Sequence, residues 1–264
     1  MRVLLVGDIV GKGGRQAACL LIPSLRQEFN CCFCIANAEN IAGGSGLTEK
    51  CVTSLLDHGV DVITAGDHVW GQRDFIGQIE RFPNVLRPAN YNKSQPGRGY
   101  GVYNIPIGGT IGIVNVIGQL FIGTLSDSPF AAVDEALAKI ERHTKSIFVE
   151  IHAEATSEKC ALGRYLDGRA TAVWGTHTHV PTADGRVLPN GTAFITDIGM
   201  VGAAESVIGR DISAVLRRFT TGLPARLKVI DDDIVLNGAI VDFDANTGKA
   251  TGIQRVERRT GMTL

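Results

Sequence analysis

The chain has 264 residues, which is long enough to bury a sizeable core in one large domain or in two small ones. Hydrophobic residues make up 44% of the sequence and charged residues 20%, and the formal net charge is -1 without a basic block, so we expect neither a long-nucleic-acid-binding protein nor a membrane-surface protein. No apolar run reaches the length of a transmembrane helix, and the first one is too short for a signal peptide.

The first predicted strand, residues 2–6, is an apolar run that leaves the carboxylate of Asp8 just beyond its carboxyl end. Glycines predict a turn over residues 11–14, and helical spacing predicts a helix over residues 17–29. The glycines do not match a nucleotide-binding loop, because the segment is one residue too short for a P-loop and G-x-G-x-x-G is absent.

Two further strands are predicted over residues 31–36 and 60–65, and each ends in polar residues. Asn37-Ala38-Glu39-Asn40 follows the first and Gly66-Asp67-His68 follows the second, and Thr48 can cap the helix between them. Three strand–helix units in succession predict a parallel sheet with right-handed crossovers. Functional sites in such sheets form at the carboxyl ends of the strands, where these polar residues stand.

The six cysteines are interpreted as small buried hydrophobic residues. Cys31 to Cys34 is formally a C-x-x-C motif, but it lies in a run typical of a buried strand, and no second C-x-x-C follows at zinc-ribbon spacing. We therefore expect a reducing compartment and a cytoplasmic protein.

The rest of the chain predicts a mixture of helices, strands and loops without repeats or linkers, so we expect a single domain over residues 1–264. Predicted helices span residues 72–82, 130–143 and 157–166, and another begins at residues 211–213. Predicted strands span residues 146–151, 170–173, 227–230, 234–242 and 250–255, with hairpins formed by 101–106 with 110–116 and by 186–188 with 192–195. Predicted loops span residues 83–99 and 116–128.

His177 and His179 follow the predicted strand at residues 170–173. Two histidines two residues apart in an extended segment project to the same side, and neutral imidazole is the commonest protein ligand for metals near neutral pH. His152 follows the strand at residues 146–151 in the same way. We therefore interpret the ends of five strands as one candidate site.

The candidate metal ligands combine carboxylate, amide and imidazole groups, a mixture that suits manganese, iron or zinc and does not suit calcium. Seven groups are too many for one tetrahedral zinc and suit two adjacent ions, which a carboxylate such as Glu39 can bridge. Two such ions are a general device for phosphate-ester hydrolysis, in which a bridging hydroxide attacks phosphorus and a nearby histidine protonates the leaving oxygen. The candidates are Asp8, Glu39, Asn40, Asp67, His152, His177 and His179.

Each of these residues also has an ordinary structural explanation. Asp8 could cap a helix, Asp67 could be a loop residue, and His68 could be a hydrogen-bonded structural histidine. Together these explanations require five strand ends to carry polar groups by chance, so we favour the site. Two features stay open: Trp70 could stack on a base or pack in the core, and the apolar segment Leu120-Phe121-Ile122 could be a partner surface or a lid.

Seven segments of the chain together resemble the YmdB-type bacterial metallophosphoesterases, a family within the calcineurin-like phosphoesterase superfamily. The resemblance runs nearly end to end and implies an α/β fold, a four-layer α/β/β/α sandwich. It implies a metal-dependent phosphodiesterase for cyclic nucleotides, with 2',3'-cyclic nucleotides favoured. The segments are Gly7 to Gly11, Asn37 to Asn40, Gly66 to Trp70, Leu86 to Tyr91, His152 to Lys159, Gly175 to Val180 and Thr196 to Met200.

The resemblance also implies a role for each site residue. It places Asp8, Glu39, Asn40 and His179 on one metal and Glu39, Asp67, His152 and His177 on the other, with Glu39 bridging and His68 as the proton donor. The implied cofactors are two ions per chain, with iron or manganese favoured and zinc possible. The implied partners are a small-molecule cyclic nucleotide or phosphodiester and further copies of the chain in a homo-oligomer.

The sequence departs from the family pattern at two positions. Asp67 stands where the family usually has Asn, and the added negative charge should tighten ion binding, weaken Lewis acidity and repel an anionic substrate. Glu150 stands where the family usually has Asp and could support His152 from behind. Two alternatives therefore remain: a nucleotide-sensing regulatory protein with weakened catalysis, and a phosphomonoesterase or RNA-acting phosphodiesterase on the same site.

Overall fold

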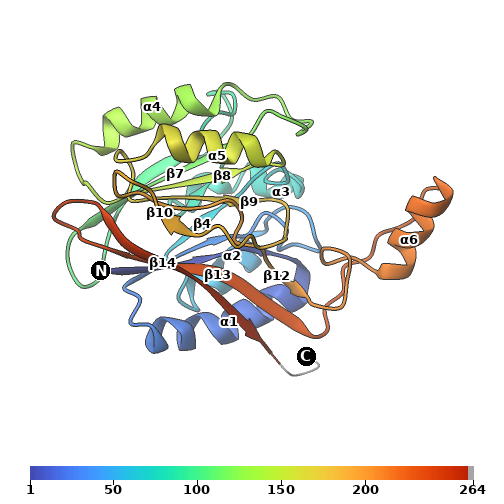
Figure 1. Cartoon of the computed structure of the whole chain (residues 1–264). Coiled ribbons are helices and arrows are strands. Elements are labelled where there is room, and N and C mark those ends of the chain that lie inside the picture. Colours follow the sequence, from blue (N-terminus) through green and yellow to red (C-terminus); the bar gives the residue numbers. More distant parts are fainter. Residues whose placement is uncertain (261–264) are drawn as a thin grey trace.

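The computed structural model describes residues 1–260, which form two β-sheets packed face to face between two layers of helices (Figure 1). Helices α1 (Gly11–Glu28) and α2 (Glu49–Leu56) cover the first sheet. Helices α4 (Pro129–Ile140) and α5 (Thr156–Tyr165) cover the second. The four-layer α/β/β/α sandwich expected from the resemblance is therefore confirmed.

The first sheet has eight strands, seven of them in the order β2-β12-β13-β1-β3-β4-β5, and β14 pairs with β13. Strands β1, β3, β4 and β5 are parallel, as the successive strand–helix units predict. The bounds are β1 Arg2–Val6, β2 Asp8–Ile9, β3 Phe33–Asn37, β4 Val62–Thr64, β5 Val85–Leu86, β12 Met200–Ala203, β13 Ile234–Phe243 and β14 Ala250–Arg259.

The second sheet has six strands in the order β10-β11-β9-β8-β7-β6. Strands β7, β8 and β9 are parallel, while β6 with β7 and β10 with β11 form the two predicted hairpins. The bounds are β6 Tyr100–Asn104, β7 Thr110–Ile117, β8 Ile147–His152, β9 Ala172–Thr176, β10 Arg186–Val187 and β11 Ala193–Ile195.

Three apolar cores separate the four layers. Leu4 and Ile22 belong to the core between α1 and the first sheet, and Val149 and Leu162 belong to the core between the second sheet and α5. Between the sheets, side chains such as Trp174 interdigitate from both inner faces. No helix among residues 1–260 combines the length and the apolar character that crossing a membrane requires.

Helix α1 begins at Gly11, so the predicted turn over residues 11–14 is wrong. Helical spacing of apolar residues starts only at Ala17, because the first turn contains glycines that approach the backbone of Val201 and Asp231 closely. A Cβ at Gly13 would lie 2.5 Å from the carbonyl oxygen of Asp231, and one at Gly14 would collide with the carbonyl of Val201. The glycines thus let the start of the helix pack against β12 and the segment before β13.

Three other predicted elements differ. The helix predicted over residues 72–82 is divided into α3 (Arg73–Ile76) and a 3-10 turn (Ile79–Arg81). Residues 227–230 form no strand and contribute one isolated bridge, and the sequence did not predict β12. The helix starting near residue 211 is confirmed as α6 (Ile212–Thr221), and the side chain of Asp211 caps it. Helix α6 projects away from the sandwich on an extended arm (Figure 1).

Candidate metal centre

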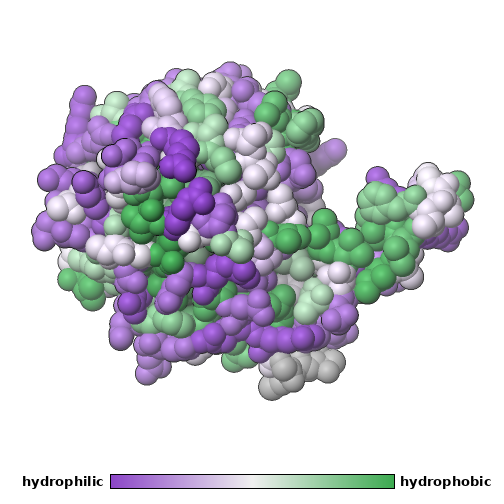
Figure 2. Space-filling model, in the orientation of Figure 1, coloured by the Kyte–Doolittle hydropathy of each residue, from purple (hydrophilic) through white to green (hydrophobic). Residues whose placement is uncertain are grey.

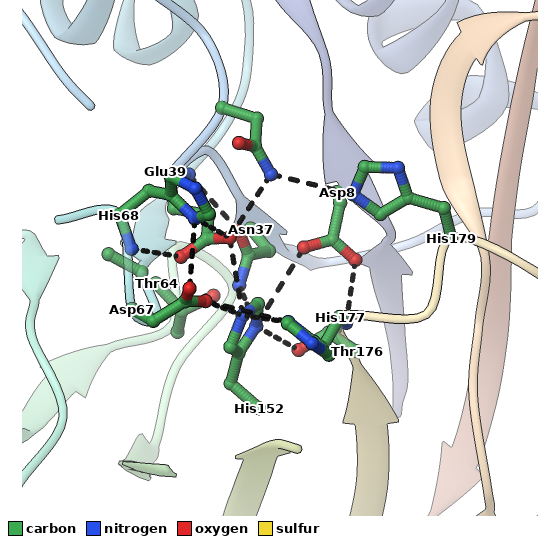
Figure 3. Close-up of polar contacts among 12 residues, drawn as sticks. Asp8, Asn37, Glu39, Thr64, Asp67, His68, His152, Thr176, His177 and His179 are labelled. Carbon is green, nitrogen blue, oxygen red and sulfur yellow. Dashed lines mark hydrogen bonds and ion pairs between the residues drawn. The ribbon is translucent and has the colours of Figure 1, made fainter. Parts of the chain in front are cut away.

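The predicted ligands converge where the carboxyl ends of strands from both sheets meet (Figure 3). Asp8 is the first residue of β2, and Glu39 and Asp67 follow β3 and β4 of the first sheet. In the second sheet, His152 is the last residue of β8 and His177 directly follows β9. Asp8, Glu39 and His152 are almost completely buried. The sequence argument about strand ends therefore identified residues that the fold brings together.

Four of the predicted ligands form one tight group: Glu39, Asp67, His152 and His177 each offer an atom within 4.8 Å of the others. Nε2 of His152 lies 3.1 Å from Oδ1 of Asp67 and 3.2 Å from Oε1 of Glu39. Nδ1 of His177 lies 3.4 Å from Oδ1 of Asp67. These are the four residues that the resemblance assigns to one ion.

Asp8 and His179 lie on the adjoining side of Glu39 (Figure 3), and Asn40 contacts both Glu39 and His179. Nδ2 of Asn40 lies 3.1 Å from Oε1 of Glu39 and 3.4 Å from Nε2 of His179. Oδ2 of Asp8 accepts a 3.1 Å hydrogen bond from the backbone N–H of His177, while its Oδ1 is buried without a hydrogen-bond partner among the described residues. A fully buried carboxylate oxygen without a donor is costly unless a cation faces it.

His68 lies between the buried cluster and solvent, with 42% of its side chain exposed. Its Nδ1 is 3.2 Å from Oδ2 of Asp67 and 3.4 Å from Oε1 of Glu39, and its backbone N–H donates to Oε2 of Glu39. The carboxylates of Asp67 and Glu39 raise the pKa of His68 to about 10. Both carboxylates therefore favour the protonated form of this imidazole.

The cluster concentrates carboxylates in a buried place, and the imidazoles compensate their charge. Burial alone would raise the pKa of Glu39 and of Asp67, but His152 and the neighbouring imidazoles lower both. Burial would lower the pKa of His152, but Glu39, Asp67 and Asp8 raise it well above its usual value. Burial raises the pKa of Asp8. The ligand set, rich in carboxylates and imidazoles and with one unpartnered oxygen, fits divalent cations.

A network of buried hydrogen bonds around Glu150 reaches the imidazole of His152. Glu150 is fully buried and accepts hydrogen bonds from Asn37, Thr64 and Thr176, and Nδ1 of His152 lies 2.9 Å from the Thr176 hydroxyl. Burial raises the pKa of Glu150 to about 7. This network fixes the imidazole orientation, as supporting partners of metal-ligating histidines do.

Sequence reasoning missed other residues at the site. A cavity of about 320 Å³ opens beside the cluster, and Glu154, Thr178 and Arg210 line it together with His68 and His177. Oε2 of Glu154 lies 3.1 Å from Nε2 of His177. Arg210 comes from the base of the distant arm, so no local pattern could identify it.

The two features left open by the sequence are now placed. Trp70 packs against the first core, and its indole N–H donates to Oε1 of Gln95 at 2.8 Å, so it does not line the cavity. In the apolar loop, Phe121 is 87% exposed, whereas Ile122 packs against the core. Both hypotheses for this loop, a partner surface and a lid, stay predictions.

A sequence model of the YmdB-like protein family matches residues 4–256. A Bacillus subtilis protein named 2',3'-cyclic-nucleotide 2'-phosphodiesterase is 44% identical over 256 residues, which cover 97% of this chain and 96% of that protein. Nearly the whole chain is therefore related to a protein named as a phosphodiesterase.

Two solved structures are similar as well. A Mycoplasma pneumoniae protein described as a novel phosphatase has a TM-score of 0.91 at 33% identity, covering 98% of this chain and 93% of that one. The calcineurin-like phosphoesterase YfkN from Bacillus subtilis has a TM-score of 0.62 at 11% identity, covering 100% and 92%. The second likeness shows the fold alone. The clustered carboxylate and imidazole side chains are ligands that suit divalent metal ions.

Proposed function

Because the chain belongs to the YmdB-like protein family, we propose that it is a phosphodiesterase that opens 2',3'-cyclic nucleotides to nucleoside monophosphates. The chain is a phosphoric-ester hydrolase of calcineurin-like fold, and the substrate class is the proposed part. The observation that carries the proposal is the cluster of Glu39, Asp67, His152 and His177 at the strand ends. Such a set of oxygen and nitrogen ligands suits the two-ion hydrolysis of phosphate esters.

We propose that Asp8, Glu39, Asn40 and His179 hold one ion and that Glu39, Asp67, His152 and His177 hold the other. The central position of Glu39 supports this division, since its Oε1 lies 3.1 Å from Asn40 Nδ2 on one side and 3.2 Å from His152 Nε2 on the other. Iron or manganese is proposed as the native metal, because both accept mixed carboxylate and imidazole ligands. Bound ions would supply Lewis acidity toward the phosphoryl oxygens.

The role proposed for His68 is proton donation to the leaving oxygen. His68 lines the cavity, its pKa is raised to about 10 by Asp67 and Glu39, and its imidazolium is partly exposed on the cavity side. When the cyclic ester opens, the leaving alkoxide takes this proton and the imidazole becomes neutral. Protonation by a positioned group avoids release of a strongly basic alkoxide.

The cavity supports a small substrate. Its volume of about 320 Å³ falls within the usual range for small-ligand pockets, and Arg210 adds a cation at its edge. The net charge of -1 does not suit a surface that tracks a long phosphate backbone. We therefore propose a mononucleotide diester rather than a long RNA as the substrate.

Two further proposals concern the surroundings of the enzyme. All six cysteines are free thiols, which supports a reducing compartment such as the cytoplasm. The exposed apolar side chains of Phe121 and Phe219 support assembly into a homo-oligomer.

The test pairs metal content with turnover. The purified protein is analysed for bound metals and then assayed with added Mn²⁺ on 2',3'-cyclic AMP, 3',5'-cyclic AMP, bis-p-nitrophenyl phosphate and the monoester p-nitrophenyl phosphate. We expect two ions per chain and fastest hydrolysis of 2',3'-cyclic AMP. Faster hydrolysis of the monoester would replace the proposal with a phosphomonoesterase. Two ions with tight nucleotide binding and without turnover would point to a nucleotide sensor, and a protein that binds no metal would contradict the site itself.

A further inference from the structure

The segment that carries the paired histidines has a strained backbone. His177 and His179 both have positive φ angles, of 97° and 65°, which residues other than glycine adopt at a cost. Such a conformation persists only where the surrounding structure holds it in place. The contacts of this segment should therefore show what holds the two histidines.

The strained backbone separates the two imidazoles. In the extended segment that the sequence predicts, they would project to the same side. In the structure, Nδ1 of His177 lies 3.4 Å from Oδ1 of Asp67, whereas Nε2 of His179 lies 3.4 Å from Nδ2 of Asn40. The two histidines thus reach the two different groups of ligands that flank Glu39.

The residue between the histidines is tied to a single buried carboxylate. Thr178 donates both its hydroxyl, at 2.8 Å, and its backbone N–H, at 3.3 Å, to Oδ2 of Asp197. The carbonyl of Val180 is the other acceptor near this hydroxyl, at 3.5 Å, so the carboxylate is the closer partner. Asp197 therefore holds the centre of the strained segment through two donors of one residue.

Asp197 is itself fixed in the interior. Its Oδ2 lies 2.8 Å from Nζ of Lys159, and its Oδ1 accepts a 2.8 Å hydrogen bond from the backbone N–H of Gly199. Its backbone N–H donates to the hydroxyl of Thr182, and its carbonyl accepts from the backbone N–H of Thr182, each at 3.0 Å. Lys159 and Asp197 are both about 1% exposed. A buried ion pair whose remaining groups are hydrogen-bonded forms a rigid anchor.

A glycine in the histidine motif makes room for this anchor. Lys159 lies in α5, and its side chain passes Gly175 of β9 on the way to Asp197. A Cβ at Gly175 would lie 2.7 Å from Cδ of Lys159 and would overlap the carbonyl oxygen of Thr196. The absence of a side chain at this position thus lets the lysine reach the carboxylate beside the histidine segment.

We infer that Thr178, Asp197 and Lys159 are positioning residues for His177 and His179. The inference rests on the proposed role of both histidines as metal ligands. The anchor holds Thr178, and Thr178 fixes the backbone on both of its sides, so the two imidazoles are placed before a metal binds. Supporting contacts of this kind raise the affinity of a metal site without touching the metal.

The first test compares Thr178→Val, which loses the hydroxyl donor, with Thr178→Ser, which keeps it. The full-length variants are freed of metal with a chelator and titrated with Mn²⁺ in a calorimeter. We expect about tenfold weaker binding for the valine variant and near wild-type binding for the serine variant.

Thr171→Val is the matched control. Thr171 directly precedes β9, at the end opposite the site, and its completely buried hydroxyl donates to the carbonyl of Gly248 at 2.7 Å. The same substitution there should lower stability and leave Mn²⁺ affinity unchanged. Equal affinity of the wild type and both Thr178 variants would overturn the positioning role, and so would an equal loss in Thr171→Val, because the effect would then come from lower stability alone.

The imidazole signals of His177 and His179 in nuclear magnetic resonance spectra supply a readout without metal. They should shift in Thr178→Val and stay in place in Thr178→Ser and Thr171→Val. Unshifted signals in Thr178→Val would contradict the inference. A wild type that binds no Mn²⁺ would contradict the ligand assignment instead, and the metal-free spectra would still decide whether Thr178 positions the histidines.

The part of Lys159 is tested with a double-mutant cycle. Lys159→Met removes the cation from the anchor, and circular dichroism shows whether the variant is folded. If Lys159 acts through Thr178, the double variant with Thr178→Val should bind Mn²⁺ more tightly than the product of the two single losses predicts. Two losses that multiply would exclude Lys159 from the anchor. If Lys159→Met does not fold, Lys159→Arg keeps the cation and should keep wild-type affinity, and weaker binding with unshifted histidine signals would contradict the anchor.

Discussion

Oε1 of Glu150 accepts a 2.7 Å hydrogen bond from Nδ2 of Asn37, which ties β8 of the second sheet to β3 of the first directly beneath the metal cluster. The same carboxyl accepts from the hydroxyls of Thr64 and Thr176, and all four side chains are completely buried. The contact joins the two halves of the site, because Asn37 ends β3 just before Glu39 and Glu150 precedes His152 within β8.

Removal of this carboxyl should destabilise the fold. Glu150→Ala leaves three buried donors without their acceptor, and we expect the free energy of unfolding to fall by about 2–4 kcal/mol in urea denaturation. Glu150→Gln is the matched control, since it preserves the volume and one acceptor oxygen, and it should lose less. An alanine variant as stable as the wild type would show that the network does not hold the sheets together.

His68→Ala should lower turnover while leaving the metal content unchanged. The imidazole is partly exposed and is not needed for any proposed ligand contact, but its proton is the one proposed for the leaving oxygen. General acid catalysis contributes about 10²–10⁴-fold, so we expect a loss of that order in kcat for 2',3'-cyclic AMP. His58→Ala is the control, because His58 lies on the surface at the end of α2 and contacts Ser54. Wild-type turnover in His68→Ala would exclude the acid role.

Asp67→Asn should weaken binding of the ion proposed between Glu39 and His177 and should improve turnover at saturating metal. The carboxylate of Asp67 contacts His152, His177 and His68 within 3.4 Å, so the loss of its charge changes the whole cluster. Elemental analysis and steady-state kinetics at several Mn²⁺ concentrations measure both effects. A wild type with one ion, whose second ion appears only in the asparagine variant, would reverse the expected direction.

The sequence indicates several of the side chains that the fold brings together, because strand ends in parallel sheets are local features. Asp8, Glu39 and Asp67 follow short apolar runs, and the alternation of strands and helices places these ends at one edge. The meeting of the two sheets could be expected only from the family resemblance, since no local pattern indicates that β8 and β9 face β3 and β4.

The unpredicted parts depend on tertiary contacts. Strand β12 is four residues long and is defined by its pairing with β2 and β13, so its sequence alone carries little signal. Arg210 reaches the cavity because its guanidinium donates to the carbonyl of Gly44 at 2.8 Å, across 166 positions of sequence. Helix α1 begins within glycines, where close backbone approach replaces the usual apolar pattern.

We expect the free energy of unfolding to decrease in acid, partly because Asp184 becomes protonated. Burial opposes its charge, but hydrogen bonds from Thr182 and Thr196 outweigh burial and lower the pKa of Asp184 in the folded protein. A lowered folded pKa stabilises the protein above the unfolded pKa of about 4, and this contribution is lost as the pH falls through the folded pKa.

Asp184→Asn should therefore be less stable than the wild type at pH 7, by about 1 kcal/mol after allowance for the solvent exposure of the group. The difference should shrink as the pH falls below the unfolded pKa of about 4 and through the lowered folded pKa, where the wild-type carboxyl becomes protonated. Urea denaturation at several pH values measures it, with Asp232→Asn as an exposed control. A difference that grows toward low pH would contradict the assignment.

Gly66→Ala should disrupt the metal cluster through sterics alone. The imidazole of His152 packs directly on Gly66, and a Cβ there would overlap the ring atoms Cγ, Cδ2 and Nε2. His152 is completely buried, so the ring can move only by leaving Asp67 and Glu39 or by displacing the backbone. We expect a loss of about 1–3 kcal/mol in the free energy of unfolding, together with fewer bound ions in elemental analysis.

Gly77→Ala is the matched control, because a Cβ at Gly77 meets nothing within 4 Å and the backbone there is right-handed helical. If both variants kept the wild-type metal content and stability, His152 would not be confined as the structure indicates, and its assignment as a fixed ligand would have to be abandoned.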